Sequence, residues 1–127
     1  MACVGPAERK WAAVSDCLFC KIVAGDIPAT IVYQDDRAVA FADINPQAPT
    51  HVLVIPRAHV VNAATVVEAD EPVVGHLVRV AAQVAAEQGL NQSGFRLVFN
   101  AGPDAGEAVK HLHLHVLGGR KMAWPPG

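Results

Sequence analysis

His111-Leu112-His113-Leu114-His115-Val116-Leu117 is the stretch of this 127-residue chain from which its fold can be worked out. Histidine alternates with leucine, and this alternation predicts a β-strand because successive side chains point to opposite faces. The three histidines then share one face, with neighbours about 6–7 Å apart along the strand. The leucines point the other way, toward a core.

The shared face places three imidazole rings where a solute can meet them. A proton on one ring disfavours a proton on the next, and partial burial acts in the same direction, so we expect neutral rings near pH 7. A neutral imidazole has one nitrogen with a free lone pair, which can bind a metal ion or attack an electrophile. His113, flanked on both sides, is the best-placed attacking group. The alternative, a polar strand edge without function, fits three histidines at strict period two less well.

Composition is typical of a single globular domain. The sequence is 52% hydrophobic and 17% charged, which argues against disorder. The formal net charge is −2 and there is no basic stripe, so we expect no nucleic-acid partner. The apolar runs are too short for a membrane span and none resembles a signal peptide. Three cysteines, an odd number, favour a reducing compartment, so we expect a cytoplasmic protein. Residues 1–15 are expected to form a flexible arm, followed by one domain at 16–127.

Turn-forming residues divide the chain into short apolar runs that are typical of strands. The expected strands cover Thr30–Tyr33, Ala38–Phe41, His51–Ile55, Phe95–Phe99 and the histidine stretch. The first two form a hairpin with a four-residue loop, and His51–Ile55 is apolar enough for the middle of a sheet. Five strands with one principal helix after the third predict an α+β fold with an antiparallel sheet.

Two helices are expected beside this sheet. Asp16 can cap a short helix over Cys17–Val23. Asp70 can cap the main helix, with Glu71 and Pro72 in its first turn and the apolar run Val73–Gln88 after them. The main helix has an apolar stripe broader than one sheet needs, so we expect it to pair with a second copy in a symmetric dimer. His76, in the middle of this helix, is expected to be structural.

The alternating histidines, the adjoining Gly118-Gly119-Arg120 and the tail Trp124-Pro125-Pro126-Gly127 resemble the histidine triad (HIT) superfamily, in its histidine triad nucleotide-binding (HINT) branch. The resemblance runs from about Asp16 to Gly127 and includes Asp43–Ile55. It implies a HIT-like five-stranded antiparallel sheet that is dimerised into a continuous sheet. It also implies hydrolysis of purine nucleoside phosphoramidates, AMP or GMP derivatives, through a nucleotidyl-histidine intermediate on His113 that releases a nucleoside 5′-monophosphate.

The same resemblance implies a role for each site residue. His113 is the nucleophile, His115 holds a phosphoryl oxygen, and His51 lies near the phosphate or the leaving group. Asp43 accepts hydrogen bonds from the ribose hydroxyls. The full set implied for nucleotide binding is Phe19, Ile22, Phe41, Asp43, Ile44, Asn100, Gly106, Glu107, Ala108, His115 and Trp124. Without the resemblance, His51 could simply open a strand, and the apolar members could be ordinary core.

The glycine-punctuated loop before the histidine stretch, Asn100–Gly106, is a candidate phosphate site. Glycines let backbone N–H groups approach an anion closely, although such a loop alone is more often just a turn. The HINT branch usually carries Gly-Gln-Ser or Gly-Gln-Thr next, whereas this chain has Gly106-Glu107-Ala108. The phosphate-facing hydroxyl is lost, and Glu107 would repel an anion if it pointed inward. We therefore expect turnover about tenfold weaker than in a typical relative.

The Cys17-x-x-Cys20 pair could be a redox pair, half of a metal site, or neither. A tetrahedral zinc site needs two further ligands, typically histidines. The resemblance to bacterial HIT proteins implies that His59 and His111 complete such a site. This zinc would be structural, and the other two histidines of the stretch would remain for chemistry.

Other function classes stay open at this point. Within the same fold, the substrate could be a dinucleoside polyphosphate. The chain could also be a nucleotide-binding scaffold with weak catalysis, which Glu107 and Ala108 favour, or a small zinc-binding interaction module.

Overall fold

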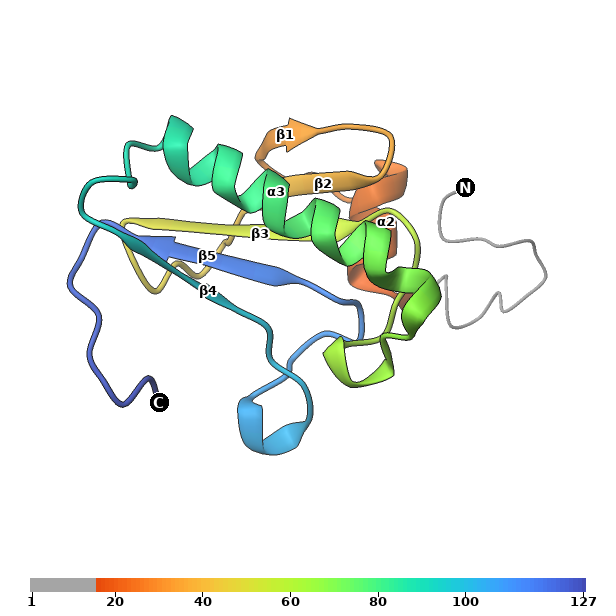
Figure 1. Cartoon of the computed structure of the whole chain (residues 1–127). Coiled ribbons are helices and arrows are strands. Elements are labelled where there is room, and N and C mark those ends of the chain that lie inside the picture. Colours follow the sequence, from red (N-terminus) through yellow and green to blue (C-terminus); the bar gives the residue numbers. More distant parts are fainter. Residues whose placement is uncertain (1–15) are drawn as a thin grey trace.

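The computed structural model describes residues 16–127, so the expected arm at 1–15 lies outside the described residues (Figure 1). Its helices and strands are α2 (Leu18–Ala24), β1 (Ile31–Gln34), β2 (Ala38–Ala42), β3 (Thr50–Pro56), α3 (Glu71–Glu87), β4 (Phe95–Val98) and β5 (Leu114–Gly118). Three short 3-10 turns are η1 (Ala63–Thr65), η2 (Glu68–Asp70) and η3 (Pro103–Ala105). The strands form one sheet in the order β1-β2-β3-β5-β4, with every neighbouring pair antiparallel. The predicted α+β class with a five-stranded antiparallel sheet is confirmed.

Strands β3 and β5 pair at the middle of the sheet, where Leu53 lies opposite His115. The strand that was predicted over the whole histidine stretch begins only at Leu114, because the β3 ladder to β5 ends at the Val54–Leu114 pair. The segment before it still alternates: Leu112 is buried with the core on one side, and His111 and His113 are buried on the other.

The two faces of the sheet are covered by different helices (Figure 1). The larger core lies between α3 and one face, where Leu77, Val80 and Val84 pack against β-strand residues such as Val54. The smaller core lies under α2, whose Phe19 packs with residues of β2 and β3. Each fully buried aliphatic or aromatic side chain contributes about 1.5–3 kcal/mol, so these two layers hold the sheet.

Helix α3 begins at Glu71, directly after Asp70, and Pro72 lies in its first turn as predicted. Asp70 is the residue before it, but its carboxylate accepts from the Val67 N–H and makes no cap bond to the helix. Gly89, with φ of +75°, follows the helix end in the left-handed conformation that favours glycine. Among the described helices, none is long and apolar enough to cross a lipid bilayer.

Helix α2 is capped by Cys17 rather than by Asp16 as predicted, because the Cys17 Sγ accepts the Cys20 N–H at 3.2 Å. The β1–β2 loop has three residues instead of four, since β1 extends to Gln34. Within it, the Asp35 carboxylate lies 2.7 Å from the Nε2 atom of His76, which ties α3 to the hairpin.

Candidate functional site

His113 is held with one ring nitrogen engaged and the other open. Its Nδ1 donates to the backbone oxygen of His111 at 2.7 Å, which leaves the lone pair on Nε2. The Nε2 atom has no hydrogen-bond partner among residues 16–127. The ring is 7% exposed, and the edge of Phe19 packs against it with centroids 5.1 Å apart. This arrangement presents a nitrogen nucleophile whose ring is held in one orientation.

His115 and His51 lie beside this ring. The Nδ1 of His115 is 2.9 Å from the Nε2 of His51, whose Nδ1 accepts from the backbone N–H of Gln47 at 3.0 Å. Burial, together with the neighbouring His113 and His51 rings, lowers the pKa of His115 to about 4. Burial also lowers the pKa of His51, against the opposing charge of Asp43, whose carboxylate is 3.4 Å away. Both rings are therefore neutral near pH 7.

A second cluster brings together the four residues that the resemblance assigned to zinc. Their ligand atoms all lie within 4.8 Å of one another. The Nδ1 of His111 is 3.2 Å from the Cys17 Sγ and 3.5 Å from the Cys20 Sγ, and the Nδ1 of His59 is 3.2 Å from the Cys20 Sγ. Ligands around a tetrahedral zinc ion lie about 3.3–3.8 Å apart, so the donor set fits this metal.

The surroundings of the second cluster also fit a metal. His111 is fully buried, and its Nε2 lies 2.9 Å from the Pro56 oxygen, which fixes the ring and leaves Nδ1 for a metal. Burial is the main cause that lowers the pKa of His111 to about 4 and lowers that of His59, so both offer lone pairs. Cys20 takes part in a disulfide bond in the structure, so its sulfur is available to a metal only in the reduced protein.

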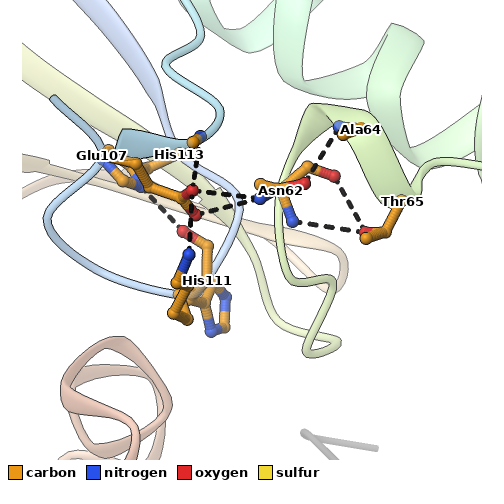
Figure 2. Close-up of polar contacts among 8 residues, drawn as sticks. Asn62, Ala64, Thr65, Glu107, His111 and His113 are labelled. Carbon is orange, nitrogen blue, oxygen red and sulfur yellow. Dashed lines mark hydrogen bonds and ion pairs between the residues drawn. The ribbon is translucent and has the colours of Figure 1, made fainter. Parts of the chain in front are cut away.

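The Glu107 carboxylate faces Asn62 and the loop that carries it (Figure 2). Its Oε1 accepts from the N–H of Gly102 at 2.7 Å, from the side-chain amide of Asn62 at 3.0 Å and from Lys110 at 3.2 Å. These partners, with the Gly102 N–H first, lower the pKa of Glu107, whose side chain is 1% exposed. The Glu107 carboxylate is therefore held by donors of the protein itself.

The expected phosphate nest is not formed by the two loop glycines. The N–H of Gly102 is occupied by Glu107, and the N–H of Gly106 donates to the Pro103 oxygen. The N–H of Ala108 has no partner among residues 16–127 and remains the open donor at this point. The sequence pattern could not show that a carboxylate of the same loop accepts the Gly102 N–H.

The other candidate nucleotide-binding residues differ widely in exposure. Phe19 and Phe41 are buried and pack edge to face, with ring centroids 5.5 Å apart. Ile44 is 99% exposed and Trp124 is 82% exposed, so neither joins that buried pair. Ile22, Asp43 and Asn100 are half-buried.

Two contacts near the histidines were missed by reasoning from the sequence. The Nε of Arg120 donates to the Gln47 oxygen at 3.0 Å. Gly119 has φ of +91°, and a Cβ there would lie 2.9 Å from Pro49. The Gly-Gly-Arg motif was a signal for both, because it follows the histidine stretch directly.

Comparisons with known proteins agree with one another. A family model described as the HIT domain matches residues 24–122. The chain is 47% identical to a HIT-like protein of Synechococcus elongatus over 88% of this chain and 97% of that protein. It is 46% identical to a 14 kDa zinc-binding protein of Zea mays over 89% of each. The crystal structure of a HIT family hydrolase from Legionella pneumophila Philadelphia 1 superposes with a TM-score of 0.87 at 48% identity, covering 88% of this chain and 100% of that one.

Proposed function

Because the chain belongs to the HIT domain family, we propose that it is a hydrolase of purine nucleoside phosphoramidates, of the HINT branch, with His113 as the nucleophile. The observation that carries the proposal is the open Nε2 of His113, whose ring is fixed by the His111 oxygen. The similarity to a protein named a HIT family hydrolase supports hydrolysis in general. A dinucleoside polyphosphate is the competing substrate within the same chemistry.

The reaction proceeds by two displacements at phosphorus. The Nε2 lone pair attacks the α-phosphorus, the phosphorus–nitrogen bond breaks, and the amine leaves with a proton taken from solvent. Water then attacks the same phosphorus and returns a proton to solvent, the bond to His113 breaks, and a nucleoside 5′-monophosphate departs. A histidine nucleophile divides one difficult step into two easier ones. In this proposal His115 and the Ala108 N–H donate to the phosphoryl oxygens, and Asp43 accepts hydrogen bonds from the ribose hydroxyls.

The test is a single turnover with adenosine phosphoramidate labelled at phosphorus. The wild-type protein should acquire label and then release labelled AMP, whereas His113→Ala should do neither. His76→Gln, a change in a histidine bonded to Asp35 and away from this cluster, is the matched control and should be labelled like the wild type. Diadenosine polyphosphate offered in parallel separates the two substrate classes. Absence of label on the wild-type protein with intact substrate would refute the proposal.

We also propose that Cys17, Cys20, His59 and His111 bind one structural zinc ion. The geometry of the four donors and the buried, hydrogen-bonded His111 support it, as does the likeness to a zinc-binding protein. A zinc ion here would join α2 to the segment before β5 and would take no part in the reaction. Cysteine ligation requires reduced sulfur, which fits the expected cytoplasmic location. Elemental analysis of protein purified with a reductant and without chelator should give one zinc per chain.

A homodimer is the third element of the proposal. Strand β4 lies at the edge of the sheet, and the outer face of α3 carries Val78 at 43% exposure. Apart from its chain neighbours and the backbone of α3 itself, no atom of residues 16–127 lies within 4 Å of a Cβ placed on Gly75, so a second helix could approach there. Pairing of two such edges would also give the expected continuous sheet. Light scattering at micromolar concentration should give twice the chain mass, and a monomer would exclude the dimer.

A further inference from the structure

We propose that the backbone N–H of Gln47 sets the tautomer of His51 and, through it, the tautomer of His115, so that His115 presents an N–H group to the substrate phosphate. The role of His115 toward phosphate rests on the proposed function. The assignment of protons to ring nitrogens does not, because it follows from hydrogen bonds of the protein alone.

In the first step, the tautomer of His51 is fixed by the backbone N–H of Gln47, which can only donate a hydrogen bond. The backbone nitrogen of Gln47 lies 3.0 Å from the Nδ1 of His51, with its hydrogen directed at that atom. An amide N–H has no acceptor capacity, so Nδ1 must carry the lone pair. His51 is buried and neutral, and its single ring proton is therefore on Nε2.

In the second step, the proton on Nε2 of His51 determines the tautomer of His115. The Nε2–H of His51 has two acceptors in reach, the Nδ1 of His115 at 2.9 Å and the Asp43 carboxylate at 3.4 Å. The shorter contact makes His115 the acceptor, and its proton must then be on Nε2. The reverse direction would put a proton on the Nδ1 of His51, facing the N–H of Gln47.

The third step concerns the atom at the end of this chain. The Nε2 of His115 is buried and has no hydrogen-bond partner among the described residues. A buried N–H without an acceptor is unfavourable, and a phosphoryl oxygen would satisfy it. The Nδ1 of His113 donates to the His111 oxygen, so the neutral tautomer of this ring has the opposite arrangement, with its lone pair on Nε2. Two neighbouring rings thus provide one nucleophile and one donor.

The same assignment bears on the second possible metal site. Asp43, His51 and His115 offer ligand atoms within 4.8 Å of one another. The Nε2 of His51 holds its proton, however, so this atom is not free to bind a metal. The proposed tautomers of His51 and His115 and a metal ion bound by these three residues therefore exclude each other.

The Gly-Gly-Arg motif holds the loop that carries the Gln47 amide. Arg120 donates to the Gln47 oxygen, and the Gln47 side chain donates to the Asn45 oxygen at 3.0 Å. Gly119 lets the end of β5 approach Pro49 more closely than any other residue could. Gln47 is therefore a positioning residue that acts through its backbone, and Arg120 supports it.

The wild-type protein provides the first test. Long-range nitrogen–proton correlation spectra of the zinc-loaded, ¹⁵N-histidine-labelled protein at pH 7 distinguish the two tautomers of each ring. We expect His51 and His115 to carry their protons on Nε2 and His113 to carry its proton on Nδ1. A proton on Nδ1 of His51 or of His115 would overturn the inference, whether or not the protein hydrolyses a phosphoramidate.

A pair of variants at one position supplies the second test. Gln47→Pro removes the N–H, whereas Gln47→Ala removes only the side chain. We expect Gln47→Pro to mix the tautomers of His51 and His115 and to lower kcat/KM for adenosine phosphoramidate about tenfold. Gln47→Ala should leave the tautomers unchanged and kcat/KM within about twofold of the wild type. Equal effects of the two variants would contradict the role of the amide, and if Gln47→Pro does not fold, the wild-type spectrum decides.

Discussion

Two groups of imidazoles share the histidine stretch, and they differ in what surrounds their ring nitrogens. His111 is fully buried between two sulfur atoms and a backbone oxygen, so both of its nitrogens have a partner. The hydrogen bonds of the His113 and His115 rings go only to backbone or to another imidazole, and each ring keeps one nitrogen without a partner among residues 16–127. Residues of one type, two positions apart, are thus suited to opposite tasks. The neighbours of a histidine, more than its place in a motif, decide whether it binds a metal or reacts.

The sharpest way to separate the two groups is to remove the nucleophile. His113→Ala should lower kcat for adenosine phosphoramidate at least about a thousandfold, because the covalent step is lost. Zinc content and the midpoint of thermal unfolding should stay close to those of the wild type. Steady-state kinetics and elemental analysis on the same preparation check both. Loss of zinc together with activity would show that the two groups are not independent.

Removal of a sulfur should have the converse result. Cys17→Ser should abolish zinc binding and lower the free energy of unfolding by about 3 kcal/mol, because metal that binds only the folded state stabilises it. Chemical denaturation in reductant, with and without added zinc, measures the difference. The wild-type protein should respond to zinc and the variant should not. A variant that keeps its zinc would place the metal elsewhere.

Acid should weaken the fold through the His51–His115 pair. The folded-state pKa of His115, about 4, lies below its ordinary value of 6.5, so the unfolded chain binds a proton first as the pH falls. The contribution of neutral His115 to the free energy of unfolding is fully present above pH 6.5. It falls by on the order of 2 kcal/mol, for a partly exposed ring, as the pH drops from 6.5 to 4. Urea unfolding at several pH values should show a shallower dependence in His115→Gln. If the free energy of unfolding depended on pH equally in the wild type and in His115→Gln, the lowered pKa of His115 would be contradicted.

The smallest expected effect comes from the support of the Gln47 loop. Gly119→Ala forces a Cβ into the left-handed region and against Pro49, which should cost about 1–2 kcal/mol of stability and reduce kcat/KM. Zinc content should not change, since this glycine lies at the other end of β5. Gly75→Ala, on open helix surface, is the matched control and should be neutral or slightly stabilising. Thermal melts of both variants, followed by kinetics, give the comparison.

Much of the architecture follows from local patterns in the sequence. Alternation placed the leucines and histidines on opposite sides, and the apolar run at His51–Ile55 correctly predicted a central strand. The main helix was found within two residues because its stripe and its glycine stop are local features. The four residues assigned to zinc do lie together, although only the family resemblance joined Cys17 to His111 across 94 positions.

The failures share a physical cause. The start of β5 depends on where β3 stops pairing, and the direction of Glu107 depends on Asn62, a residue 45 positions earlier. The donor in the Gln47–His51 hydrogen bond is a backbone amide, which every residue except proline possesses. The residue type at position 47 therefore does not predict this hydrogen bond. Contacts between backbone groups and side chains distant in the sequence produce no periodic pattern of residue types, so they cannot be predicted from such a pattern.

The carboxylate of Glu107 has a consequence for the free protein. It already joins Gly102 and Lys110 of its own loop to Asn62 before any nucleotide arrives, so two separate segments keep their relative positions in solution. A ligand that meets a preorganised loop loses little affinity to conformational ordering. Binding at this end of the sheet should therefore be fast, with an association rate limited by encounter and not by rearrangement of the loop.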